Sequence, residues 1–130
     1  MTLAIDMVGT NLPSGTKTYN VNFCKYLGKK KLKNKIYIFI TRNYLKYIKT
    51  NNPNIHFVIK SNYLSNILFR FFWMQLLLPF ELKRLKIKKL YSPMNFGPLL
   101  LKFLNIKFIL GLHSNLPWVF FEKMPGNFFK

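Results

Sequence analysis

Residues 3–15 read LAIDMVGTNLPSG, and this stretch decides the class of fold. Leu3 to Val8 is a short apolar run, and the glycines, proline and serine that follow it are typical of a loop. Beyond the loop, apolar residues recur at three- and four-residue steps until Gly28: Tyr19, Phe23, Tyr26 and Leu27. The pattern predicts a buried strand, a loop and then an amphipathic helix.

The same alternation continues along the chain. Further strands are predicted at residues 36–40, 55–59, 89–91 and 106–112. Helices are expected at residues 43–49, 63–85 and 98–104, the second of them kinked at Pro79. About five short apolar strands alternating with helices predict an α/β fold of the Rossmann-like kind. We expect a parallel sheet of strand order 3-2-1-4-5 with helices on both faces.

Composition limits the classes of protein that remain. A chain of 130 residues fits one domain, and its 50% content of hydrophobic residues is incompatible with intrinsic disorder. The formal net charge of +18 comes from 21 Lys and Arg against Asp6, Glu81 and Glu122. Such a charge attracts nucleic acid, anionic lipid or a sugar diphosphate. The alternative is codon bias, because the abundant Lys, Asn, Ile and Phe all have A/T-rich codons.

The sequence favours a cytoplasmic location. Cys24 is the only cysteine, which excludes an internal disulfide and a cysteine-based metal site. The first residues lack a basic segment before the apolar run, so a signal peptide is not expected. Residues 63–80 have about the length of a membrane span but contain Arg70, Gln75 and Pro79. We expect this segment to be a buried or surface-attached helix.

Three loops at predicted strand ends carry residues suited to ligand contact. Residues 9–16 place Gly15 and Thr16 at a helix start, where backbone amides can approach a phosphate. Residues 91–98 hold Asn95 between prolines and a glycine, and His113 follows the last strand directly. Each loop also has a structural alternative. Residues 9–16 would only make a turn and cap the helix, residues 91–98 would only change the direction of the chain, and His113 would only form a structural hydrogen bond. His56, inside a strand, is interpreted as structural, and HExxH and Walker A motifs are absent from the sequence.

Six segments carry a family resemblance by their order along the chain: Ala4-Ile5-Asp6-Met7, Ser14-Gly15, Tyr19 to Phe23, Trp73 to Pro79, Tyr91-Ser92-Pro93 and Leu112-His113-Ser114. Together they resemble the amino-terminal domain of family 4 glycosyltransferases, which have the GT-B fold. In that family the third of these regions carries a Tyr-x-x-Asn-Leu helix, and the fourth a Gln-x-x-Leu-Pro helix. The resemblance covers residues 3 to about 118.

The resemblance implies transfer of a sugar from a nucleotide-sugar to a glycan or lipid-linked acceptor, with retention at the anomeric carbon. It implies that Gly15 and Thr16 bind the donor diphosphate and that Asn95 binds the acceptor. It further implies that His113 is catalytic and contacts the transferred sugar. The nucleotide-sugar is a substrate, and neither a cofactor nor a metal is expected. The setting implied is the synthesis of cell-envelope polysaccharide.

The resemblance also implies a particular domain organisation. We expect residues 1–130 to be an incomplete acceptor-side domain that lacks the carboxyl-terminal donor-binding domain and is inactive alone. We also expect peripheral contact of this domain with the inner face of the membrane. One alternative is a basic α/β module that binds nucleic acid or anionic membrane, and of these two ligands we favour the membrane. A structural protein that docks on a second polypeptide is the other alternative.

Overall fold

The chain forms one five-stranded parallel sheet with the order β3-β2-β1-β4-β5. The structure is a computed structural model and describes residues 2–9, 15–48, 50–94 and 96–112. Its strands are β1 Leu3–Asp6, β2 Ile36–Thr41, β3 Ile55–Lys60, β4 Lys89–Ser92 and β5 Lys107–Leu110. The predicted α/β class and the predicted strand order are therefore confirmed.

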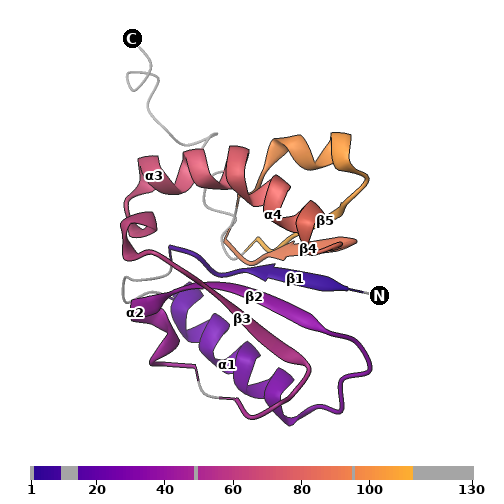
Figure 1. The fold of residues 1–130 in the computed structure, drawn as a ribbon. Coiled ribbons are helices and arrows are strands. Elements are labelled where there is room, and N and C mark those ends of the chain that lie inside the picture. Colours follow the sequence, from indigo (N-terminus) through magenta and orange to yellow (C-terminus); the bar gives the residue numbers. More distant parts are fainter. Residues whose placement is uncertain (1, 10–14, 49, 95, 113–130) are drawn as a thin grey trace, which may run out of the picture.

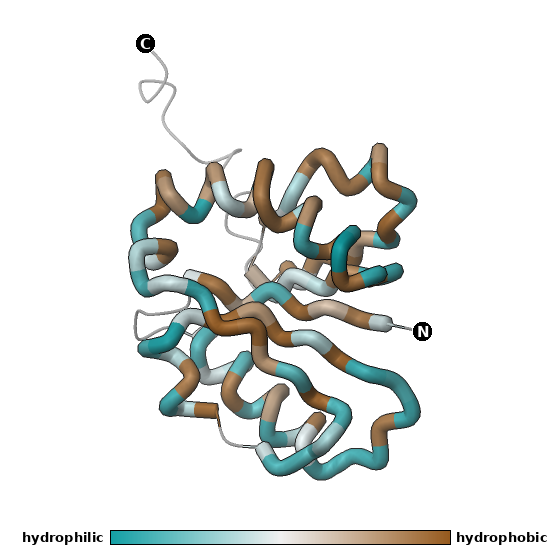
Figure 2. Tube along the Cα trace, viewed as in Figure 1, coloured by the Kyte–Doolittle hydropathy of each residue, from teal (hydrophilic) through white to brown (hydrophobic). Residues whose placement is uncertain are grey.

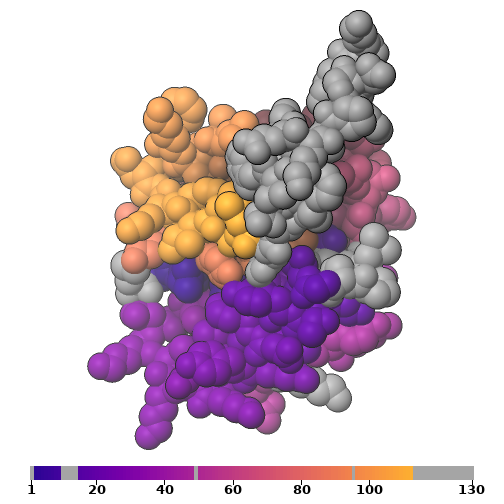
Figure 3. All heavy atoms as spheres, turned by 180° about the vertical axis from the view of Figure 1, so that it is seen from behind, coloured from indigo at the N-terminus to yellow at the C-terminus, as the bar shows by residue number. Residues whose placement is uncertain are grey.

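Helices cover both faces of the sheet (Figure 1). On one face lie α1 Gly15–Lys29 and the single turn α2 Arg42–Leu45. On the other lie α3 Ile67–Phe72 and α4 Leu78–Arg84, joined by the π-helical turn η2 Trp73–Leu77. Two 3₁₀ helices complete the described elements: η1 Asn62–Ser65 and η3 Leu99–Leu104. Seen from behind, the atoms of η3 and β5 lie above those of α1 (Figure 3).

The sheet separates two hydrophobic cores. Alternate side chains of a strand point to opposite faces, so Ala4 and Val8 pack under η2 and α4 while Ile5 and Met7 pack on α1. This explains why the first strand is apolar without interruption except at Asp6, and the apolar strands are visible inside the molecule (Figure 2). By the same alternation, Asp6 faces the layer that contains α3.

The predicted helix over residues 63–85 is observed as the separate 3₁₀ turn η1 and a continuous helical run over residues 67–84 that consists of α3, η2 and α4. Pro79 stands in the first turn of α4 and is buried, and the widened turn η2 comes directly before it. A proline has no amide hydrogen to donate to the preceding turn, which disturbs a regular α-helix at this position. The amide of Leu78 instead donates to the carbonyl of Trp73, five residues back. The predicted long helix is therefore observed over residues 67–84 with a π-helical turn before Pro79, and its predicted start at Tyr63 is corrected to Ile67.

Other boundaries differ by smaller amounts. The helix predicted at residues 43–49 is limited to the single turn α2, and the strand predicted at residues 106–112 spans only Lys107–Leu110. The short helix after Pro98 is of the 3₁₀ type and ends at Asn105, whose φ of 52° lies in the left-handed region. Among the described residues, no helix is both long enough and apolar enough to cross a membrane.

Candidate ligand site at the carboxyl edge of the sheet

The strand order places a topological switch point between β1 and β4, because the chain runs outward from β1 toward β3 and from β4 toward β5. In open parallel sheets, ligands bind at the carboxyl ends of the strands that flank this point. Here those ends are marked by Asp6, the last residue of β1, and Ser92, the last residue of β4. Both polar side chains are fully buried.

Two of the predicted site residues lie at this edge. Gly15 and Thr16 are the first residues of α1, which follows β1. Gly15 is exposed, and no described atom outside its immediate neighbours lies within 4 Å of the position that a Cβ would occupy. Backbone there is open to close approach by a ligand. The other two predicted site residues, Asn95 and His113, lie outside the described residues.

Arg70 and Asp6 form a buried charged pair that the sequence did not reveal as a site. Arg70 on α3 is 5% exposed and Asp6 is completely buried. One carboxylate oxygen of Asp6, Oδ1, accepts a hydrogen bond of 3.1 Å from the amide of Val8. Within the described part of the chain, Oδ2 of Asp6 and the Nε and Nη2 atoms of Arg70 have no hydrogen-bond partner. The only signal in the sequence was a lone charge within an apolar segment.

Burial governs the protonation of this pair. It raises the pKa of Asp6, and this effect exceeds the opposing influences of the Arg70 charge and the hydrogen bond from Val8. Burial likewise lowers the pKa of Arg70, against the opposing charge of Asp6. No direct ion pair joins the two described side chains. The two side chains therefore influence one another through their charges without a direct ion pair.

We expect the folded chain to lose stability as the pH rises through the pKa of Asp6. Because the pKa of Asp6 is raised in the folded state, its protonated form stabilises the folded chain. This stabilisation is complete below the ordinary carboxyl pKa and is lost as the pH rises above the pKa of the folded state. Urea unfolding from acidic to neutral pH measures the effect. The Asp6→Asn variant, which cannot ionise there, should lose less stability over the same range. Identical pH profiles for the two proteins would show that Asp6 does not titrate in this way.

Arg70 is held between a glycine and an aromatic ring. Gly9 has a φ of 90°, and a Cβ on it would lie 2.7 Å from Cδ of Arg70. On another side, the guanidinium carbon lies 4.5 Å from the centre of the Phe96 ring. Phe96 is 39% exposed, so the contact joins the buried guanidinium to the molecular surface. Glycine is required at position 9 both for its backbone conformation and for the space it leaves.

Asn20 adds a third buried polar side chain at the same edge. It lies in α1, is fully buried, and its Nδ2 is 3.8 Å from Sδ of Met94, which follows β4. Its Oδ1 atom has no hydrogen-bond partner among the described residues. Buried polar atoms are ordinarily paired in folded proteins. Asp6, Asn20 and Arg70 together therefore supply two free acceptor atoms and two free donor atoms.

The loop after β4 is anchored to the helices around it. Ser92 Oγ donates to the carbonyl of Phe96 at 2.9 Å, and Gln75 bonds both the carbonyl of Gly97 and the amide of Leu99. Gln75 belongs to the segment that resembles the Gln-x-x-Leu-Pro helix. Its structural effect is to hold this loop on η2, beside Arg70 on the preceding turns.

A second feature lies at the ends of β2 and β3. An open cavity of about 610 Å³ is lined by Arg42, Ile59, Lys60, Ser61, Asn62 and Tyr63. Lys60 forms an ion pair with Glu81, whereas Arg42 is exposed. This cavity is at the same edge of the sheet as Asp6, because the strands are parallel.

Other candidate chemistry is restricted by burial. Cys24 is buried, and burial raises the pKa of its thiol to about 12, which makes it a poor nucleophile at neutral pH. His56 stacks on Tyr37 with ring centres 5.3 Å apart, a contact that agrees with its structural interpretation. No group of three or more His, Cys, Asp or Glu that could hold a metal occurs among the residues that the structure describes.

Comparison of the chain with protein-family models, with curated proteins and with solved structures gave no match.

Proposed function

We propose that the chain binds a nucleotide-sugar at the carboxyl edge of its sheet and serves as the acceptor-side domain of a glycosyltransferase. The observation that carries this proposal is the set of unpaired, buried polar atoms on Asp6, Asn20 and Arg70 at the switch point. The strand order agrees with the fold that the family resemblance implies. The transferred sugar would pass to a glycan or lipid-linked acceptor.

The chemistry of the cluster suits a polyhydroxylated ligand. Each sugar hydroxyl both donates and accepts hydrogen bonds, so it needs donors and acceptors side by side. Arg70 and Asp6, on the α3 side of the sheet, provide two donors and one acceptor, and Asn20 on α1 provides one further acceptor on the other side of the sheet. Phe96 adds a partly exposed apolar ring in contact with Arg70. A small number of polar groups beside apolar surface is typical of small-molecule sites.

The diphosphate of the donor has a separate recognition element in this proposal. The positive end of the 15-residue helix α1 attracts anions, and the open space at Gly15 allows close contact with its backbone. Thr16 adds a hydroxyl there. Charge that develops on the leaving diphosphate would be stabilised by these fixed donors and by the guanidinium of Arg70. His113 would contact the transferred sugar, as the resemblance implies.

The acceptor would occupy the neighbouring part of the edge. The cavity that contains Arg42 is large enough for a sugar ring, and its cationic side chain suits a phosphate on a lipid-linked acceptor. In the resemblance, Asn95 helps to form the acceptor site as well. In this proposal neither donor binding nor acceptor binding requires a metal ion, because Arg70 and the start of α1 supply the positive charge.

The experiment is a binding assay with a panel of nucleotide-sugars. Ligand-detected NMR would test each donor, and its free nucleotide, against the chain. Binding that distinguishes one nucleotide-sugar from its free nucleotide would support the proposal. Absence of binding at millimolar concentrations to every donor would reject it. Salt-sensitive binding of all polyanions alike would support the basic binding module instead.

A further inference from the structure

The short helix α3 buries its charged residue and exposes its apolar residues. In its sequence ILFRFF, the single charged residue Arg70 is buried, whereas all five hydrophobic residues are at least half exposed. A helix on the surface of a water-soluble domain normally turns its apolar side to the core. Here α3 continues directly into η2, whose Trp73 and Met74 are buried, so Arg70, three and four residues before them, lies on the buried side and the apolar residues lie outside.

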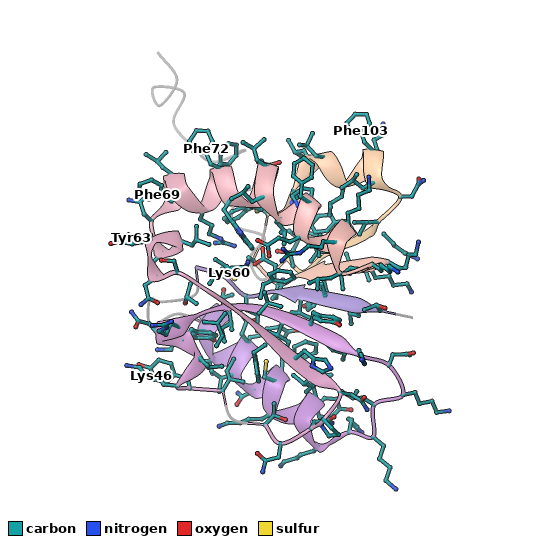
Figure 4. The ribbon with its side chains drawn as sticks, in the orientation of Figure 1. Lys46, Lys60, Tyr63, Phe69, Phe72 and Phe103 are labelled. Carbon is teal, nitrogen blue, oxygen red and sulfur yellow. The ribbon has the colours of Figure 1, made fainter. Side chains whose placement is uncertain are left out.

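The exposed apolar surface continues beyond α3. Its members on α3, η2, α4 and η3 are Ile67, Leu68, Phe69, Phe71, Phe72, Leu76, Leu77, Phe80, Leu99, Leu100 and Phe103. We call these residues the apolar face. Figure 4 shows Phe69, Phe72 and Phe103 pointing away from the sheet on this side of the molecule. Phe103 is 79% exposed, which is unusual for so large an apolar side chain. A contiguous surface of this kind marks an interaction site.

Lysines border the apolar face at one end. Lys83, Lys86 and Lys88 line an open cavity of about 400 Å³ that Phe103 also lines. All three lysines are exposed. The described part of the chain contains only two acidic residues, of which Asp6 is buried and Glu81 is paired with Lys60. The cationic border of the apolar face is therefore not neutralised by carboxylates among the described residues.

We propose that the apolar face docks on the surface of an anionic lipid bilayer. Its aromatic and aliphatic side chains would enter the boundary between headgroups and acyl chains, and the three bordering lysines would contact lipid phosphates. Charge complementarity favours this partner over a second copy of the chain. A second copy carries the same formal charge of +18, so contact between two such faces would oppose their lysines. The inference goes beyond sugar transfer and does not depend on it.

Vesicle flotation tests the proposal directly. The chain should float with vesicles of equal parts phosphatidylglycerol and phosphatidylcholine, and much less with phosphatidylcholine alone. The double variant Phe69→Ser and Phe72→Ser should bind at least about tenfold more weakly, since two exposed rings no longer enter the lipid. Its control is Tyr26→Ser with Tyr47→Ser, two exposed rings on the α1 side of the sheet. That control should bind like the unchanged protein.

Two matched triple variants test how much the bordering lysines contribute to membrane binding. Changing Lys83, Lys86 and Lys88 to Gln should weaken binding to anionic vesicles about tenfold or more at low salt. The same change at Lys29, Lys31 and Lys33, which are exposed near the end of α1, removes equal charge far from the apolar face. If the two triple variants lose the same affinity for anionic vesicles, binding depends only on net charge. That result would overturn the proposed membrane-binding surface.

A gain-of-signal measurement avoids dependence on variants that fail to fold. Measured against the unchanged protein, whose Trp73 and Trp118 also emit, the Phe72→Trp variant should show additional blue-shifted emission and additional quenching by brominated lipids, whereas Tyr26→Trp should add neither. Failure of the unchanged protein to float with anionic vesicles would overturn the proposal. So would self-association that is abolished by the Phe69→Ser and Phe72→Ser double variant, because it would identify a second copy as the partner.

Discussion

Arg70→Met is expected to weaken nucleotide-sugar binding by roughly 10- to 100-fold while the chain remains folded. The substitution removes the two unpaired guanidinium donors but keeps a long apolar side chain beside Phe96. A hydrogen bond to a charged group contributes about 1.5–3 kcal/mol, which corresponds to this range of affinity. Asp6 would remain buried without its cationic neighbour, so its pKa, already raised by burial, would rise further.

The measurement is a titration of the bound nucleotide-sugar, with circular dichroism to verify the fold. Arg84→Met is the matched control, because Arg84 is exposed at the end of α4 and, within the described part of the chain, forms no hydrogen bond or ion pair with Asp6, Asn20 or Arg70. If the two methionine variants bind the donor with equal affinity, Arg70 has no role in the site and the proposed function loses the observation that carries it.

Gly9→Ala is expected to lower the free energy of unfolding by about 2–4 kcal/mol. A side chain at a φ of 90° is strained, typically by about 1–3 kcal/mol. In addition, its Cβ would lie within 3 Å of three Arg70 side-chain atoms, and relief of such overpacking costs about 1–3 kcal/mol. Because the Arg70 side chain is flexible, it can move and relieve part of the clash. The total loss of stability should therefore be smaller than the sum of the largest strain cost and the largest overpacking cost. Urea unfolding measures the difference.

Gly15→Ala provides the comparison for that measurement. Gly15 has no positive φ, and no described atom lies near its missing Cβ, so an alanine there fits without strain. Its stability should change by less than about 1 kcal/mol. The same variant tests diphosphate contact, because a methyl group at Gly15 would hold a phosphate away from the backbone. Equal destabilisation at positions 9 and 15 would contradict the role assigned to Gly9.

The parallel sheet could be predicted because its strands are encoded locally. Runs such as Ile36–Thr41 are apolar on both sides and are bounded by loop residues, and parallel connections allow few strand orders. The boundaries within residues 63–85 could not be predicted, because the turn type around Pro79 depends on how Trp73 and Leu78 pack into the core. The family resemblance to glycosyltransferases stays a prediction.

The candidate site was only partly predictable. The strand-end loops placed Gly15 and Thr16 at the start of a helix at the carboxyl edge of the sheet, since a strand followed by glycine and a helix is a local pattern. Asp6 entered the sequence argument only as part of the first strand. Its partnership with Arg70 joins residues far apart in the chain, and no local periodicity records such a contact.

The sequence by itself determined the α/β class, the strand order and the strongly basic charge, because these follow from local hydrophobic patterns and composition. Only the tertiary structure decided which side of α3 faces the solvent. Nearly every residue of that helix is apolar, so its sequence has no polar side that could orient it. The orientation follows from packing further along the same helical run, where Trp73, Met74 and Leu78 are buried, so Arg70 falls on the buried side and the phenylalanines of α3 fall on the surface.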